Sequence, residues 1–172
     1  EFEGGAYSTL SPVVLSRGVI HAAGPYRCAN VLARAACYAT NNVPTGAFRG
    51  FGAPQVFFAL ESHIDKLAEK IGMNPYQFRL KNCVHIGDTL STTQLLKESV
   101  AAEECLSKVA EAADFEQKWS ANGRTDKRMN GQTRKGIGLS LYMHGGAFTG
   151  SGEAIMKTEA GLRLNKNGTV SV

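Results

Sequence analysis

The sequence lacks the patterns that mark most protein metal centres. Its four cysteines contain no C-x-x-C pair, and its four histidines form no H-E-x-x-H arrangement, so neither a zinc site nor an iron–sulfur site is indicated. Four cysteines in 172 residues are more typical of buried thiols in a reducing compartment than of a disulfide framework. We therefore expect a cytoplasmic protein and no metal-ligating side chain in this chain.

Two classes of partner also lack support. No apolar run reaches the length that spans a bilayer, and no signal peptide is visible. The net charge is +4 at pH 7, but the charges are scattered. The densest basic segment carries no aromatic side chain between Arg124 and Arg134, so it lacks the rings on which bases stack. We expect neither a nucleic acid nor a membrane as partner.

The chain nevertheless has the composition of a folded domain. Hydrophobic residues make up 43% of the chain and charged residues 20%, which is ordinary for a globular protein. It begins at Glu1 and ends at Val172 within a strand-like alternation. We expect a single fragment of a larger domain, with a strand–loop–helix part in residues 1–121, a polar linker at 122–136 and late strands in 137–172.

Segments rich in β-branched residues stand at both ends of the chain. Residues 13–23 (VVLSRGVIHAA) and 31–40 (VLARAACYAT) predict early strands, although the alanines of the second would also allow a helix. Residues 137–143 (IGLSLYM) predict a late strand. Residues 154–172 predict a hairpin whose outgoing strand follows the turn pair Asn167-Gly168.

Helical patterns fill the middle of the chain. Apolar residues recur at helical spacing from Pro54 to Ile71, and Gly72 follows as a terminator. Asn74 is placed to cap a short second helix, and a third runs from about residue 99 to residue 119. The chain therefore predicts an α+β fold, in which a mixed, mostly antiparallel sheet from the early and late strands packs against helices from the middle.

The stretch Gly46–Gln55 (GAFRGFGAPQ) is the strongest candidate for a functional site. Residues 46–52, which we call the Arg49 loop, place Arg49 between Phe48 and Phe51, and two glycines allow positive φ and close approach to a ligand. The predicted helix begins directly afterwards, and a helix N-terminus favours anions. Two interpretations remain open: a ligand-binding loop, or an ordinary turn with two buried rings and a surface arginine.

These residues resemble a known family. The run from Arg17-Gly18-Val19-Ile20-His21 through the F-R-G-F-G-x-P-Q motif at residues 48–55 resembles the molybdenum-binding portion of the xanthine dehydrogenase / aldehyde oxidase family. The likeness extends over nearly the whole chain and is best for the purine-hydroxylating branch. A second glycine-rich segment, residues 144–153, differs from what we expect in the animal enzymes and favours a bacterial member.

The resemblance implies roles for particular residues. Phe51 and Phe148 correspond to two rings that sandwich a heteroaromatic substrate, and Thr149 corresponds to an adjacent substrate contact. Arg17, 32 positions before Arg49, corresponds to the catalytic arginine that binds the substrate's carbonyl group. A guanidinium there would stabilise charge that builds on the ring during attack. The residues that would contact the molybdenum–pterin cofactor (Mo-molybdopterin) are Phe48, Arg49 and Gly50.

The resemblance also implies what lies elsewhere. The family's catalytic glutamate belongs to a later segment that is not found here, and iron–sulfur clusters and FAD are expected on other domains or subunits. The expected function is part of a molybdenum subunit that hydroxylates a purine such as xanthine or hypoxanthine with oxygen from water. Two alternatives remain open: a hydroxylase of nicotinate-like heterocycles or aldehydes, and an isolated fragment that folds without activity of its own.

Overall fold

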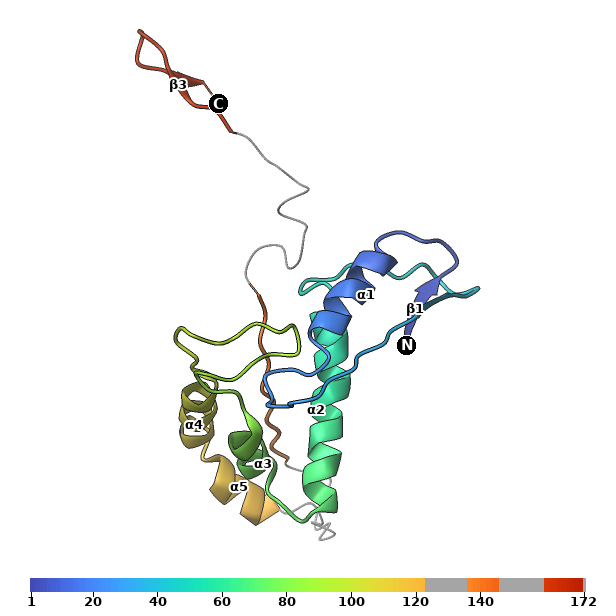
Figure 1. Cartoon of the computed structure of the whole chain (residues 1–172), viewed down its shortest axis with the longest axis vertical. Helices are drawn as coiled ribbons and strands as arrows, with labels where there is room; N and C mark the ends of the chain where they lie inside the picture. Colours follow the sequence, from blue (N-terminus) through green and yellow to red (C-terminus); the bar gives the residue numbers. More distant parts are fainter. Residues whose placement is uncertain (123–135, 146–159, 172) are drawn as a thin grey trace, which may run out of the picture.

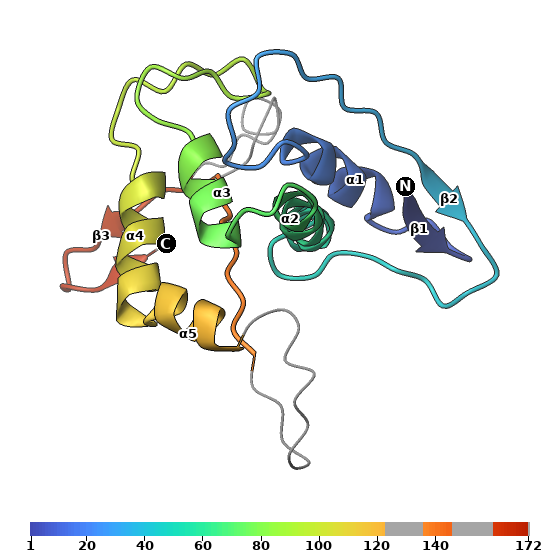
Figure 2. The same cartoon turned by 90° about the horizontal axis from the view of Figure 1, so that it is seen from below.

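The computed structural model describes residues 1–122, 136–145 and 160–171. The long helix α2 stands between two groups of elements, with α1 and the β1–β2 pair on one side and α3, α4 and α5 on the other (Figures 1 and 2). None of the helices in the described ranges is both long and apolar enough to cross a membrane. The elements in chain order are β1 (Phe2–Gly5), α1 (Ser11–Ile20), β2 (Cys37–Ala39), α2 (Ala53–Lys70), α3 (Pro75–Asn82), α4 (Ala102–Ala112), α5 (Phe115–Asn122), β3 (Arg163–Leu164) and β4 (Val170–Ser171).

The predicted strand at residues 13–23 is wrong, because this segment forms most of helix α1. Ser11, Val14 and Gly18 are the buried residues of the helix, and His21 is buried directly after it. Their spacing of three, four and three residues is that of one helix face. Packing of this face against α2 therefore outweighs the β-propensity of the branched residues, which is a weak preference.

In the described residues the sheets are smaller than predicted, and a mostly antiparallel sheet is not confirmed. β1 pairs with β2 in parallel, with Phe2 opposite Cys37 and Glu3 opposite Tyr38. The chain between them passes through α1, as a parallel pair requires a long connection. β3 and β4 form a separate antiparallel pair. In the described residues the early and late strands therefore share no sheet, although the mixture of helices and strands is confirmed.

Of the other strand predictions, two are confirmed in part and the one for residues 137–143 is wrong. Of residues 31–40, three form β2, and their partner β1 lies in what we expected to be an entry loop. The late hairpin is confirmed around Gly168, whose φ of +81° closes the turn. Residues 137–143 form no strand, and the backbone N–H of Leu141 donates to a side chain instead of to a neighbouring strand.

The helix predictions are largely confirmed. α2 begins one residue before Pro54, and the side chain of Asn74 accepts a hydrogen bond from the Tyr76 N–H and so caps α3. The predicted third helix is two helices, because the chain turns at Asp114, whose φ is +50°. α4 also starts later than expected, after Ala101 rather than at Ser99.

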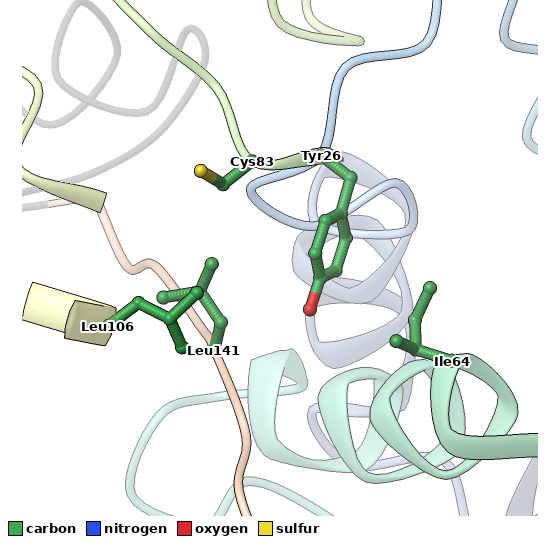
Figure 3. Packing of buried hydrophobic residues seen from close by; sticks show 5 residues of the cluster. All are labelled: Tyr26, Ile64, Cys83, Leu106 and Leu141. Atoms are coloured by element: carbon green, nitrogen blue, oxygen red, sulfur yellow. The ribbon is translucent and has the colours of Figure 1, made fainter. Parts of the chain in front are cut away.

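The core joins α2 to the segments that follow it. One buried cluster draws a residue each from the segment after α1, from α2, from the end of α3, from α4 and from residues 136–145 (Figure 3). Burying such side chains stabilises a fold by about 1.5–3 kcal/mol each. The cluster consists of Tyr26, Ile64, Cys83, Leu106 and Leu141.

A buried ionic network lies beside this cluster. The carboxylate of Glu61 accepts hydrogen bonds from the Tyr26 hydroxyl at 2.6 Å, from Arg79 Nε at 2.8 Å and from the Leu141 N–H at 2.8 Å. Arg79 is fully buried and also donates to Asp65 at 2.8 Å. Burial disfavours its charge, but Asp65 and Glu61 outweigh burial and raise the pKa of Arg79. Burial and the bond to Glu61 raise the pKa of Tyr26, which therefore remains a donor.

We expect Arg79→Met to destabilise the full-length protein by about 3–5 kcal/mol, because it leaves the carboxylate of Glu61 buried without its cation. The matched control is Lys108→Met, which breaks the exposed 2.5 Å pair with Glu104 and should cost less than about 1 kcal/mol. Urea denaturation measures both. The double variant Glu61→Leu/Arg79→Met should recover part of the loss. Equal effects of the two single variants would contradict the role of the network.

Candidate functional site

Glycines allow the Arg49 loop to pack directly on α1. A Cβ added at Gly52 would lie 2.2 Å from the carbonyl oxygen of Val14 and 3.2 Å from the backbone nitrogen of Gly18. A Cβ at Gly18 would in turn lie 2.9 Å from the ring of Phe2. The backbone of α1 at Gly18 therefore adjoins the loop at Gly52, and the half-buried Arg17 precedes Gly18 on the helix.

Three consecutive residues of the loop have positive φ. Gly50, Phe51 and Gly52 have φ values of +94°, +56° and +103°. The Phe51 N–H donates to the Phe48 carbonyl at 2.7 Å, and the Ala53 N–H donates to the Gly50 carbonyl at 3.2 Å. A non-glycine residue in this conformation costs about 1–3 kcal/mol, and such residues gather at functional sites. The strain at Phe51 therefore favours a functional loop over an ordinary turn.

The side chains of the loop differ in exposure. Phe48 is 76% exposed and Arg49 is also exposed, whereas Phe51 is half-buried. The interpretation of the loop as a turn with two buried rings is therefore wrong for Phe48. Behind the loop stands the N-terminus of the 18-residue helix α2, whose dipole favours an anion at this end.

Two histidines that the sequence analysis did not assign to the site lie beside the loop. His21 is only 2% exposed, its Nδ1 donates to the Arg17 carbonyl at 2.7 Å, and its ring meets Phe57 edge-on with centroids 5.7 Å apart. His144 stacks on His21 at 5.3 Å, and its Nε2 lies 3.1 Å from the Gly50 carbonyl oxygen. Burial, opposed by the bond to Arg17, lowers the pKa of His21, and the nearby His144 and Arg17 lower it further. His21 is therefore neutral at pH 7.

The structure thus brings together some of the predicted site residues. Arg17, Gly50 and Phe51 come from two segments whose backbones touch, and His21 follows Arg17 by one helical turn. Had residues 13–23 been assigned to a helix, that i, i+4 spacing would have placed His21 near Arg17. Phe148 and Thr149 lie outside the described residues, so their roles stay predictions.

A cavity of about 670 Å³ lies between the β1–β2 pair and helices α1 and α2. Its wall includes Gly46, the first residue of the Arg49 loop, and Gln55, together with Val14, Cys37 and His63. None of the predicted site residues in the described ranges lines it. Within the ranges that the structure describes, no group of three or more His, Cys, Asp or Glu side chains is arranged to hold a metal ion.

Comparisons with known proteins show which family the chain belongs to. Residues 2–83 match the molybdopterin cofactor-binding domain family, and this range contains α1 and the Arg49 loop. The chain is 34% identical over 168 residues to a probable xanthine dehydrogenase subunit from Bacillus subtilis, and the match covers 97% of the chain and 21% of that protein. The chain belongs to the xanthine dehydrogenase family.

Relatives within the xanthine dehydrogenase family carry different names. The nicotinate dehydrogenase large molybdopterin subunit of Eubacterium barkeri is 41% identical over 63% of the chain and 26% of its own length. The solved structure of an aldehyde oxidoreductase from Desulfovibrio gigas matches with a TM-score of 0.61 and 34% identity over 72% of the chain and 14% of that protein. The chain spans about a fifth of the length of the curated relatives it matches.

We expect Gly52→Ala to destabilise the full-length protein by about 2–5 kcal/mol, from the positive φ and from the clash with the Val14 carbonyl. The matched control is Gly72→Ala, since Gly72 also has positive φ (+67°) but nothing lies within 4 Å of its added Cβ. This control should cost only about 1–2 kcal/mol. Thermal unfolding compares the two variants, and equal losses would show that α1 and the loop do not touch at Gly52.

Proposed function

We propose that the chain forms part of the molybdenum-cofactor-binding subunit of a cytoplasmic hydroxylase that oxidises a purine such as xanthine or hypoxanthine. The observation that carries the proposal is the contact of the α1 backbone at Gly18 with the Arg49 loop at Gly52. Through this contact, α1, which carries the proposed substrate residue Arg17, lies against the Arg49 loop, which carries the proposed cofactor residues. Iron–sulfur and flavin domains or subunits complete the proposed enzyme.

The Arg49 loop fits a phosphate-bearing pterin. Arg49 is exposed and carries a fork of five donors that suits phosphate, and the N-terminus of α2 adds favourable polarity for an anion. Gly50 and Gly52 have positive φ, which glycine adopts without strain, so the loop can keep this conformation on either side of Phe51. When bound, the cofactor supplies the oxygen-transfer and electron-accepting chemistry of the reaction.

The chain's own residues would bind and orient the substrate. Phe51 offers one flat face for a heteroaromatic ring, and Phe148 is proposed to offer the other. Such aromatic contacts contribute about 0.5–1.5 kcal/mol each beyond burial, and their larger effect is to hold the ring in a reactive orientation. Arg17 is proposed to donate to the carbonyl oxygen of a purine, with Thr149 as a further contact.

A nicotinate-like heterocycle or an aldehyde is the alternative substrate. The 41% identity to the nicotinate dehydrogenase subunit supports the first, and the structural likeness to an aldehyde oxidoreductase supports the second. Values of kcat/KM for xanthine, nicotinate and a simple aldehyde, measured on the intact enzyme, decide between them. The 172 residues alone are proposed to be inactive, because the catalytic glutamate and the remaining walls of the site lie elsewhere. One molybdenum per purified 172-residue chain would contradict this.

We expect Arg49→Met to lower the molybdenum content of the purified full-length subunit. A hydrogen bond to a charged group contributes about 1.5–3 kcal/mol, so cofactor affinity should fall about tenfold or more. Inductively coupled plasma mass spectrometry measures the metal, and Arg163→Met in β3 is the control, since Arg163 is exposed and lies in the late hairpin. Full molybdenum content in Arg49→Met would exclude a cofactor role for the side chain.

We expect Arg17→Met to reduce kcat/KM for xanthine by about 10²–10³, the usual loss when a donor to developing charge is removed. Turnover of a simple aldehyde should change little, because an aldehyde lacks the ring carbonyl that Arg17 is proposed to bind. Arg163→Met again serves as the control. The same loss on both substrates would rule out the carbonyl contact and would point to a structural role for Arg17.

A further inference from the structure

One contact joins two residues that are 94 positions apart. None of the roles assigned above explains this contact. His144 Nε2 lies 3.1 Å from the carbonyl oxygen of Gly50. The other ring nitrogen, Nδ1, lies 2.8 Å from the carbonyl oxygen of Gly145. Both oxygens only accept, so in the bond to Gly50 Nε2 carries the hydrogen and donates it. The same oxygen accepts the Ala53 N–H at 3.2 Å, so both lone pairs of the Gly50 carbonyl are used. His144 therefore bonds to the backbone of the Arg49 loop at its central glycine.

The ring of His144 is also fixed on its flat side. It stacks on His21 with centroids 5.3 Å apart and planes inclined by 20°. His21 is itself held by the Arg17 carbonyl and by the edge-on ring of Phe57. The ring of His144 therefore contacts α1 through His21 and the Arg49 loop through Gly50.

Residues 136–145 have a second attachment three residues earlier. Leu141 is buried in the core cluster, and its N–H donates to the Glu61 carboxylate at 2.8 Å. Between the two attachments, Tyr142 is exposed. Leu141 thus attaches this segment to α2, and His144 attaches it to the loop. In the sequence, Phe148 follows His144 by four positions.

We propose that His144 is a positioning residue, whose bond to the Gly50 carbonyl holds residues 141–145 against the Arg49 loop and so supports the loop beside Phe51. This inference rests on the proposed function, which assigns Gly50 to the cofactor and Phe51 to the substrate. The imidazole combines a flat face for His21 with a donor for Gly50. Phenylalanine at this position retains only the flat face, and glutamine retains only the donor.

The first test measures the attachment itself and needs neither molybdenum nor substrate. The full-length subunit is treated with chymotrypsin, and mass spectrometry follows the initial rate of cleavage after Tyr142, counted separately from cleavage after the phenylalanine that each Phe variant introduces. His144→Phe should raise the rate of this cleavage about tenfold, as expected when local opening loses one hydrogen bond. His144→Gln should restore it close to wild type. The control is His63→Phe, which replaces an exposed histidine of α2 and should leave the rate unchanged.

The second test measures whether the attachment affects substrate binding in the intact enzyme. His144→Phe should raise KM for the heteroaromatic substrate about tenfold with kcat and molybdenum content unchanged. Phe51, the residue after Gly50, is then held less firmly, which weakens ground-state binding and transition-state binding alike. His144→Gln should keep a KM near that of wild type. A merely structural residue would instead lower thermal stability and molybdenum content without this split.

The outcomes separate the two proposals. Unchanged cleavage after Tyr142 in His144→Phe would overturn the attachment, and faster cleavage with unchanged KM would overturn its role toward the substrate. A wild-type subunit that contains no molybdenum would contradict the proposed function, while the cleavage measurement would still decide on the attachment. If the His144→Phe protein does not fold, His144→Gln is the variant to measure. Faster cleavage after Tyr142 in His144→Gln would contradict the proposal that the hydrogen bond to Gly50 holds the segment.

Discussion

The structure depends on one buried carboxylate. Glu61 sits midway along α2 and accepts hydrogen bonds from Tyr26, Arg79 and Leu141, which come from three segments far apart in the sequence. A carboxylate in such a place is costly unless a cation and further donors compensate it. The fully buried Arg79 supplies the cation, and it also donates to the backbone carbonyl of Glu61 at 3.3 Å. The network therefore fixes α3, the segment after α1 and residues 136–145 against one helix.

The candidate site lies toward the N-terminal end of that same helix. α2 begins where the Arg49 loop ends, and small residues at Gly18 and Gly52 let α1 approach both. The segment that Glu61 holds at Leu141 continues to His144, which returns to the loop at Gly50. Core and site are thus linked through two elements, α2 and residues 136–145. A site assembled from distant segments needs such rigid support to hold its geometry within fractions of an ångström.

The parts that the sequence predicted well are those determined locally. α2 and α3 have helical periodicity with Pro54, Gly72 and Asn74 at their ends, and these signals act within a few residues. α1 was missed because its branched residues favour a strand when judged one by one, while its buried face appears only when α2 is present. The break at Asp114 was missed because it interrupts an otherwise continuous helical pattern.

The site was predictable only as far as a resemblance reached. The motif at residues 48–55 identified the loop and the family, and residues 2–83 match the cofactor-binding domain. The contact of His144 with Gly50 could not be predicted from the sequence, since no local pattern joins a histidine to a carbonyl 94 positions away. Likewise no local pattern in the sequence marks Glu61, one of the charged residues of α2, as buried. It is buried because its partners, Tyr26, Arg79 and Leu141, arrive from elsewhere in the chain.

Hydrogen exchange at the amide of Leu141 tests the central role of Glu61 most directly. In the full-length subunit this amide should be protected, because its acceptor is a buried carboxylate oxygen. In the double variant Glu61→Leu/Arg79→Met, which keeps an apolar core, the account predicts exchange at Leu141 at least about tenfold faster while the amides of α2 stay protected. Unchanged protection of Leu141 in that variant would contradict the account, because the carboxylate would then not be what holds residues 136–145.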